Sequence, residues 1–300
     1  MLKIAFNHHY VHTLPEGHRF PMAKYELLPQ QLLLEGTINE DAFFNPDKID
    51  KDLALAVHDK TYYNDLLGLK LDRSAQRKTG FVHNEQLILR EQIIIEGTRK
   101  CTEYAIENGV SMNIAGGTHH AFTNRGEGFC MLNDQAIAAK WLLDNNKAKK
   151  ILIIDLDVHQ GNGTAEIFRN TPEVFTFSMH GENNYPLKKE ISDLDVNLPD
   201  GIKDSDYIYL LEKSLDDIFK VFTPDFLFFQ SGIDIIETDK LGRLGVSIQG
   251  CKKRDEIVLQ MAKNLNLPIV VSMGGGYSEE IKYIIEAHAN TFRTAQHIFF

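Results

Sequence analysis

Cysteine is scarce in this sequence: 300 residues contain three, Cys101, Cys130 and Cys251. They are widely spaced and form no Cys-x-x-Cys pair, so a disulfide framework is not indicated. Long apolar runs are also missing: the N-terminus lacks the apolar core of a signal peptide, and no stretch reaches about 18 apolar residues. We therefore expect a protein of a reducing compartment, the cytoplasm, with no membrane span.

Positive charge is in deficit. Lysine and arginine number 32 against 42 acidic residues, which gives a net charge of −10. A direct nucleic-acid partner usually requires a basic face, so we expect none. The same charge is compatible with cationic substrates. Hydrophobic content of 43% and charged content of 25% are typical of a globular protein. No repeat, low-complexity tract or linker divides the chain.

The order of apolar runs and helical patterns predicts an α/β protein. We expect strands over residues 2–6, 53–57, 111–115, 174–178, 225–230 and 268–272, and another opening at Ile151. Helices are predicted over residues 24–35, 58–69, 84–108, 134–143, 204–221, 246–264 and 279–298. Residues 71–83 and 181–200 are predicted as loops. Strands that alternate with helices imply βαβ units, hence a mainly parallel sheet covered on both faces.

The most informative stretch is residues 151–164, Ile-Leu-Ile-Ile-Asp-Leu-Asp-Val-His-Gln-Gly-Asn-Gly-Thr. A continuous apolar run that ends in polar residues and glycines predicts a buried parallel strand. Asp157 and His159 stand two residues apart, so on extended backbone they point the same way. A carboxylate and an imidazole on one side of a strand end can bind one metal ion. The alternative is an acidic strand end followed by a capping turn.

Three further strand ends carry unusual side chains: His119-His120, Asp234 and Gly276-Tyr277. Right-handed crossovers bring the carboxyl ends of parallel strands to one edge of a sheet, where ligands bind. Two carboxylates and one histidine leave a metal position open, as catalytic sites require. A histidine pair supplies a base and an acid, and a tyrosine hydroxyl can donate to an oxyanion. Taken singly, each feature also fits packing, a turn or a helix cap; together they indicate metal-assisted amide or ester hydrolysis.

The sequence resembles the histone deacetylase family, and the matching motifs span nearly the whole chain in family order. They are Gly117-Thr118-His119-His120-Ala121, Gly128-Phe129-Cys130-x-Leu132-Asn133-Asp134, Asp155-Leu156-Asp157-Val158-His159-Gln160-Gly161-Asn162-Gly163, Gln230-Ser231-Gly232-Ile233-Asp234 and Gly274-Gly275-Gly276-Tyr277. The third motif is closer to class IV and related bacterial members than to class I. The resemblance implies the arginase–deacetylase fold: three αβα layers around a mainly parallel, roughly eight-stranded sheet, in a single catalytic domain of residues 1–300.

The resemblance also implies roles for individual residues. Asp157, His159 and Asp234 would bind zinc, although these ligands also suit Fe²⁺. His120 would be the general base and then the acid, His119 would hold the attacking water with Asp155 as its partner, and Tyr277 would donate to the carbonyl oxygen. Substrate-binding positions would be Gly128, Phe129, Tyr185 and Gly275. A structural potassium ion would use Asp155, Ser178 and Met179.

One position departs from the class I pattern. Where those members place an aspartate beside the second histidine, this chain has Asn162. An amide can orient the imidazole but does not stabilise imidazolium as a carboxylate does. The substitution therefore predicts a lower pKa for His120.

Other functions stay open at this point. Arginase-type hydrolysis on the same fold needs a second metal and additional aspartates, and Gly161 and Ile236 occupy those positions. A non-catalytic acyl-lysine binder would be expected to lack a ligand, a histidine or the tyrosine, and none is missing. The candidate substrates are acetyl-lysine or longer acyl-lysine in peptides and proteins, and acylated polyamines or other small amides. The oligomeric state cannot be read from the sequence.

Overall fold

The computed structural model describes residues 1–300 and contains one eight-stranded, all-parallel sheet in the order β2-β1-β3-β8-β7-β4-β5-β6. The strands are β1 (Lys3–Ala5), β2 (Phe43–Phe44), β3 (Val110–Asn113), β4 (Ile151–Asp155), β5 (Val174–Gly181), β6 (Leu194–Leu198), β7 (Phe226–Gln230) and β8 (Ile269–Ser272). Since every strand runs the same way, all carboxyl ends lie at one edge. The predicted sheet architecture is confirmed.

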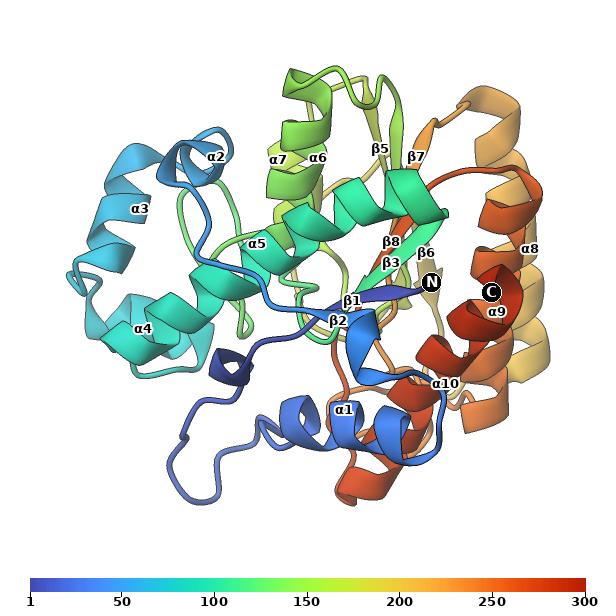
Figure 1. Ribbon diagram of the computed structural model, residues 1–300, viewed down its shortest axis with the longest axis horizontal. Helices are drawn as coiled ribbons and strands as arrows, with labels where there is room; N and C mark the ends of the chain where they lie inside the picture. The colour runs from blue at the N-terminus through green and yellow to red at the C-terminus, as the bar shows by residue number, and fades with distance from the viewer.

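Helices cover both faces of the sheet because alternate strand residues point in opposite directions. In β4, Ile151 and Ile153 pack with alanines of α6, whereas Leu152 and Ile154 belong to the larger core beneath α8, α9 and α10. Figure 1 shows α5, α6 and α7 together in one layer, and α8, α9 and α10 grouped on the other side. The helices are α1 (Lys24–Leu34), α2 (Lys51–Leu55), α3 (Lys60–Leu67), α4 (Arg73–Thr79), α5 (Glu85–Asn108), α6 (Asp134–Asp144), α7 (Asn162–Phe168), α8 (Asp204–Val221), α9 (Ile248–Asn264) and α10 (Ile281–Phe299).

The prediction of a strand over residues 53–57 was wrong. Residues 53–55 belong to α2, and residues 56–57 form the turn after it. The helix begins after Asp50, whose carboxylate accepts a hydrogen bond from the backbone N–H of Asp52 at 2.8 Å. Leucine and alanine are among the strongest helix formers, and the cap supplies the start signal. The strand that lies beside β1 is instead β2, which has two residues.

Two predicted loops also contain regular structure. Within residues 71–83, Asp72 caps α4 by accepting from the N–H of Ala75 at 2.8 Å, and Gly80 ends the helix with a φ of 76°. Within residues 181–200, β6 pairs with β5 at the edge of the sheet. No helix combines the length and apolar character needed to cross a membrane.

Candidate active site

Three buried side chains converge where β4 and β7 end. Asp157 and His159 follow β4, and Asp234 follows β7, its neighbour in the sheet. His159 Nδ1 lies 3.0 Å from Asp157 Oδ1 and 3.2 Å from Asp234 Oδ2. One ligand atom from each residue lies within 4.8 Å of the others. The structure thus brings together the three residues that the sequence predicted as a metal site.

This group has the character of a cation site. Asp234 Oδ2 is buried and has no hydrogen-bond partner apart from its ion-pair contact with His159, although buried acidic oxygens are usually fully hydrogen-bonded. A Cβ atom at Gly275 would lie 2.0 Å from this oxygen, so only glycine leaves the space beside it open. Burial, together with the charge of Asp157, raises the pKa of Asp234 to about 7. Two carboxylates and one imidazole suit Zn²⁺ or Fe²⁺, so these residues fit a divalent metal ion.

The two adjacent histidines have different partners. His119 Nδ1 lies 2.7 Å from Asp155 Oδ2, and His120 Nδ1 lies 2.6 Å from Asn162 Oδ1. Burial disfavours the charged form of His119, but the carboxylates of Asp155 and Asp157 outweigh it and raise its pKa to about 9. Burial and the charges of His119 and His159 lower the pKa of His120 well below its usual value. Neighbouring groups whose pKa values diverge in this way can divide acid and base roles between them.

Tyr277 follows the glycine turn after β8. Its ring centroid lies 6.4 Å from that of His159 and 5.8 Å from that of Phe129. Its backbone N–H donates to Asp239 Oδ2 at 2.6 Å, which fixes the chain after the turn. Burial and the charges of Asp234 and Asp157 raise the pKa of the Tyr277 hydroxyl, so it keeps its proton.

Lys24 is a site residue that the sequence did not identify. Its side chain, 1% exposed, comes from the first turn of α1 and donates to the carbonyl oxygen of Gly274 at 3.0 Å. The ammonium group also lies 5.8 Å from the ring centroid of Tyr277. A lysine at the start of an amphipathic helix ordinarily faces solvent, so the sequence carries no signal for this placement.

A cleft of about 620 Å³ leads down to these residues. Phe129 and Tyr185 both line it, and the ring of Tyr185 meets that of His120 edge to face at 5.0 Å between centroids. Gly128 passes so close to His120 that a Cβ there would lie 2.5 Å from its ring. At the foot, a space of about 40 Å³ lies among His119, His120, Gly275 and neighbouring residues.

The wall residue Phe129 has an unusual backbone, with a φ of 66°. Such a conformation costs an ordinary residue free energy and persists where surrounding contacts enforce it. Here the N–H of Phe129 donates to the carbonyl of Thr79, and the N–H of Gly128 donates to that of Lys78, both at 3.0 Å. The last turn of α4 therefore holds this wall of the cleft in place.

The predicted potassium ligands lie on adjacent strands. Asp155 of β4 pairs in register with Ser178 of β5, and Met179 follows directly. Asp155 Oδ1 accepts from the N–H of Asp157 at 3.2 Å, and Ser178 Oγ lies 2.9 Å from His180 Nδ1. Potassium binding at this position stays a prediction.

Asp134, a residue of the Gly128–Asp134 motif to which the sequence assigned no role, supports the turn that carries His119 and His120, which we call the histidine turn. Its Oδ1 accepts hydrogen bonds from the N–H groups of Gly117 and Thr118, and its Oδ2 accepts from the hydroxyls of Thr98 and Ser272. Asp134 is fully buried at the start of α6. Through these hydrogen bonds it links α5, the histidine turn and β8.

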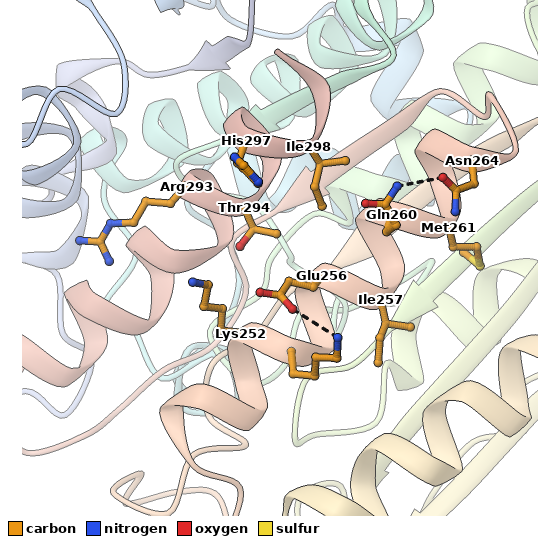
Figure 2. Close-up of a pocket in the computed structure, with 11 residues that line it drawn as sticks. Lys252, Glu256, Ile257, Gln260, Met261, Asn264, Arg293, Thr294, His297 and Ile298 are labelled. Atoms are coloured by element: carbon orange, nitrogen blue, oxygen red, sulfur yellow. Dashed lines mark hydrogen bonds and ion pairs between the residues drawn. The ribbon is translucent and has the colours of Figure 1, made fainter.

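A second groove, of about 630 Å³, lies between α9 and α10 and shares no residue with the cleft. Figure 2 shows Gln260 of this groove paired with Asn264, at 2.8 Å, whereas Arg293, Thr294 and His297 are drawn without a partner in the groove. The one group of three potential metal ligands, Asp157, His159 and Asp234, lies at the sheet edge and not in this groove.

Comparison with known proteins identifies the family. The histone deacetylase domain matches residues 18–292. The chain belongs to the histone deacetylase family. This deacetylase-family chain is 38% identical to an uncharacterized protein of Picosynechococcus, over 99% of both chains. It is 28% identical to histone deacetylase 2 of Arabidopsis thaliana, over 89% of this chain and 72% of that protein.

Solved structures of the family have the same fold. A crystal structure of a histone deacetylase homologue complexed with SAHA has a TM-score of 0.85 at 26% identity, over 99% of this chain and 84% of that one. A homologue from Aquifex aeolicus has a TM-score of 0.83 at 25% identity, over 98% and 84% of the two chains. The resemblance and the arginase–deacetylase fold inferred from the motifs are confirmed.

Proposed function

We propose that this protein is a metal-dependent hydrolase, a single catalytic domain over residues 1–300, that removes acetyl groups from lysine side chains. Family and fold both indicate a deacetylase-type hydrolase. The observation that carries the proposal is the meeting of the Asp157–His159–Asp234 group with a histidine pair and Tyr277 at the foot of one cleft. Acetylated polyamines are the alternative substrates.

Asp157, His159 and Asp234 would hold a divalent metal ion, Zn²⁺ or Fe²⁺. Such an ion, when bound, polarises the acyl carbonyl and lowers the pKa of water beside it. Asp155, Ser178 and Met179 would hold a structural potassium ion behind this centre. The oxygen donors there suit a hard cation, and the paired strands keep Asp155 and Ser178 adjacent.

His120 would act as the general base. Asn162 Oδ1 also accepts the N–H of Gly163 at 3.1 Å, which identifies this atom as the oxygen. His120 Nδ1 must then be the donor, so the neutral ring keeps its lone pair on Nε2. The lowered pKa leaves the ring neutral near pH 7. His120 can therefore take a proton from the attacking water and later deliver it to the leaving amine.

His119 and Tyr277 would stabilise charge. The raised pKa of His119 favours its cationic form, which, held by Asp155, positions the water and lowers the energy of negative charge nearby. The hydroxyl of Tyr277 would donate a hydrogen bond to the carbonyl oxygen as that oxygen becomes anionic. Phe129 and Tyr185 would enclose the aliphatic stem of the acylated lysine.

The size of the inner space favours a short acyl group. About 40 Å³ is available among the residues at the foot of the cleft. A water molecule occupies roughly 10–15 Å³ by this measure. An acetyl methyl group fits, whereas a long hydrocarbon tail does not unless neighbouring side chains move. The volume thus supports deacetylation over removal of fatty acyl groups.

The test is hydrolysis of one lysine peptide carrying acetyl, butyryl, octanoyl or myristoyl groups, beside N-acetylspermidine, with metal-quantified enzyme. We expect the highest kcat/KM for the acetyl peptide, and loss of turnover in Tyr277→Phe and His120→Ala. Turnover that rises with chain length would overturn the short-acyl assignment. Turnover of the polyamine alone would overturn the lysine substrate. No turnover at full metal occupancy would favour a non-catalytic binder.

A further inference from the structure

The mouth of the cleft is positively charged, although the chain as a whole carries a net charge of −10. Four cationic side chains line it, and Glu127 is the single acidic one. The four are Arg19, Arg77, Lys78 and Arg243, and all are exposed. They come from the segment before α1, from α4 and from the segment before α9, so they surround the opening from several elements.

Glu127 does not cancel this charge. One of its oxygens accepts from Nε of Arg125 at 2.8 Å, and the other accepts from the hydroxyl of Tyr185 at 2.6 Å. Both oxygens are therefore engaged by a neighbouring cation and by the wall of the cleft. The carboxylate orients Tyr185 and has little capacity left for a substrate cation.

These four side chains, which we call the rim cations, have few partners of their own. Arg19, Arg77 and Lys78 take part in none of the ion pairs of the protein, and Arg243 has one exposed contact, 3.5 Å from Asp200. The guanidinium of Arg19 lies 5.0 Å from the ring centroid of Phe129, beside the substrate channel. Its N–H donors remain available for a carboxylate.

A local structural role explains part of this set only. Arg77 and Lys78 lie in the last turn of α4, where cations stabilise a helix end. Arg19 and Arg243 belong to no helix, so helix stabilisation does not account for them. The carbonyls of Lys78 and Thr79 bind the N–H groups of Gly128 and Phe129, so the charged end of α4 is anchored beside the wall.

From this arrangement we infer that the enzyme prefers acyl-lysines with Asp or Glu at neighbouring positions of the peptide. The inference rests on the proposed function and specifies its substrate class. Carboxylates that flank the scissile side chain would meet the rim cations as the lysine enters the cleft. Acylated polyamines and lysine-rich peptides would instead bring ammonium groups to a cationic opening. The net charge of −10 is compatible with cationic substrates, but the positive charge at the mouth of the cleft favours anionic ones.

The experiment uses three acetyl-lysine peptides that are identical except for Glu, Gln or Lys on both sides of the modified residue. With the wild-type enzyme at about 50 mM salt, we expect kcat/KM for the Glu peptide to exceed that for the Lys peptide by roughly tenfold. At about 500 mM salt the ratio should fall to about twofold, because salt screens exposed charges. Equal values at low salt, or faster hydrolysis of the Lys peptide, would overturn the inference.

Variants locate the effect. Arg77→Gln/Lys78→Gln and, on a separate element, Arg243→Gln should each reduce the Glu-over-Lys ratio by about threefold. The second variant guards against a general disturbance of α4. Lys213→Glu, on the exposed side of α8, is the charge-matched control for the double variant and should leave the ratio unchanged. A ratio that falls equally in the control would show an effect of net charge and would overturn a rim-specific role.

A binding measurement separates this inference from the proposed function. Fluorescence anisotropy of the three labelled peptides with the Tyr277→Phe variant gives Kd under conditions where hydrolysis is strongly reduced. Tightest binding of the Glu peptide supports recognition of flanking carboxylates by the rim cations, whether or not the wild-type enzyme hydrolyses the peptide. If that order holds while no peptide is hydrolysed, the proposed function fails and the rim inference stands. If all three bind equally while the wild-type enzyme is active, the rim inference fails alone.

Discussion

The amide oxygen of Asn162 accepts a hydrogen bond from Nδ1 of His120 at 2.6 Å. The adjacent histidine, His119, faces the carboxylate of Asp155 instead. One turn therefore presents two imidazoles of the same chemistry beside partners of different charge. The pKa of His119 rises to about 9, while that of His120 falls well below its usual value.

Replacement of Asn162 by aspartate should move the acidic limb of the rate profile to higher pH. The base must be neutral to accept a proton, so the limb follows the pKa of His120. A carboxylate at position 162 favours imidazolium, and we expect a shift of about one pH unit. The measurement is kcat/KM from about pH 5 to about pH 8 for wild type and Asn162→Asp. An unmoved limb, with both enzymes fully loaded with metal, would refute the role of Asn162.

Removal of the Tyr277 hydroxyl should reduce kcat and leave the fold intact. The hydroxyl makes no hydrogen bond within the protein, so Tyr277→Phe deletes a donor without breaking a contact. Loss of one oxyanion donor typically reduces kcat by about 10²–10³-fold. We expect that reduction with a KM changed by less than about threefold and an unaltered Tm. A variant with nearly wild-type kcat would remove Tyr277 from the chemistry.

Gly275→Ala should impair metal binding. The added methyl would lie 2.0 Å from Asp234 Oδ2 and 2.9 Å from Asp157 Oδ2, so a predicted ligand must move. Elemental analysis should find about one divalent ion per wild-type chain and a large reduction in the variant. Gly17→Ala is the control. Gly17 has a φ of 76°, and no heavy atom lies within 4 Å of the new Cβ, so the substitution should lower stability and leave the metal content unchanged. Equal metal content in both variants would contradict the site.

Buried Lys24 should make stability rise with pH. Burial lowers its pKa from 10.5 to about 8, although the charges of Asp234 and Asp157 oppose the shift. In this window the unfolded chain binds a proton that the folded chain releases, so raising the pH favours folding. We expect the free energy of unfolding of wild type relative to Lys24→Met to grow by up to about 3 kcal/mol between these pKa values. Denaturant titrations across the window measure it, and a constant difference would contradict the shift.

Much of the site was accessible from the sequence because its residues follow recognisable strands. Asp157 and His159 stand after an apolar run, and Asp234 after another; the topology of parallel sheets then places them at one edge. Their spacing and the order of the motifs needed no knowledge of side-chain packing. The same logic placed the histidine pair and Tyr277.

The errors arose where local pattern and tertiary context diverge. Residues 53–57 are a short apolar run of the length typical of a strand. The N-cap at Asp50 instead starts α2, which includes residues 53–55. β2 has two residues, too few for a recognisable pattern, and β6 is a half-exposed edge strand of five residues that lacks a continuous apolar run. Lys24 required the tertiary structure, since its ammonium is buried by contacts with a turn 250 positions further along the chain.

The position of β8 in the sheet has a consequence for how the protein is made. β8 is the last strand in the chain, yet it pairs with β3 on one side and β7 on the other. Until the ribosome has released Ile269–Ser272, the nascent chain can form two separate sheet fragments, β2-β1-β3 and β7-β4-β5-β6. The glycine turn and Tyr277 emerge directly afterwards. Translation thus delivers the strand that joins the halves and the residue that completes the site almost together, and a prematurely terminated chain would have neither.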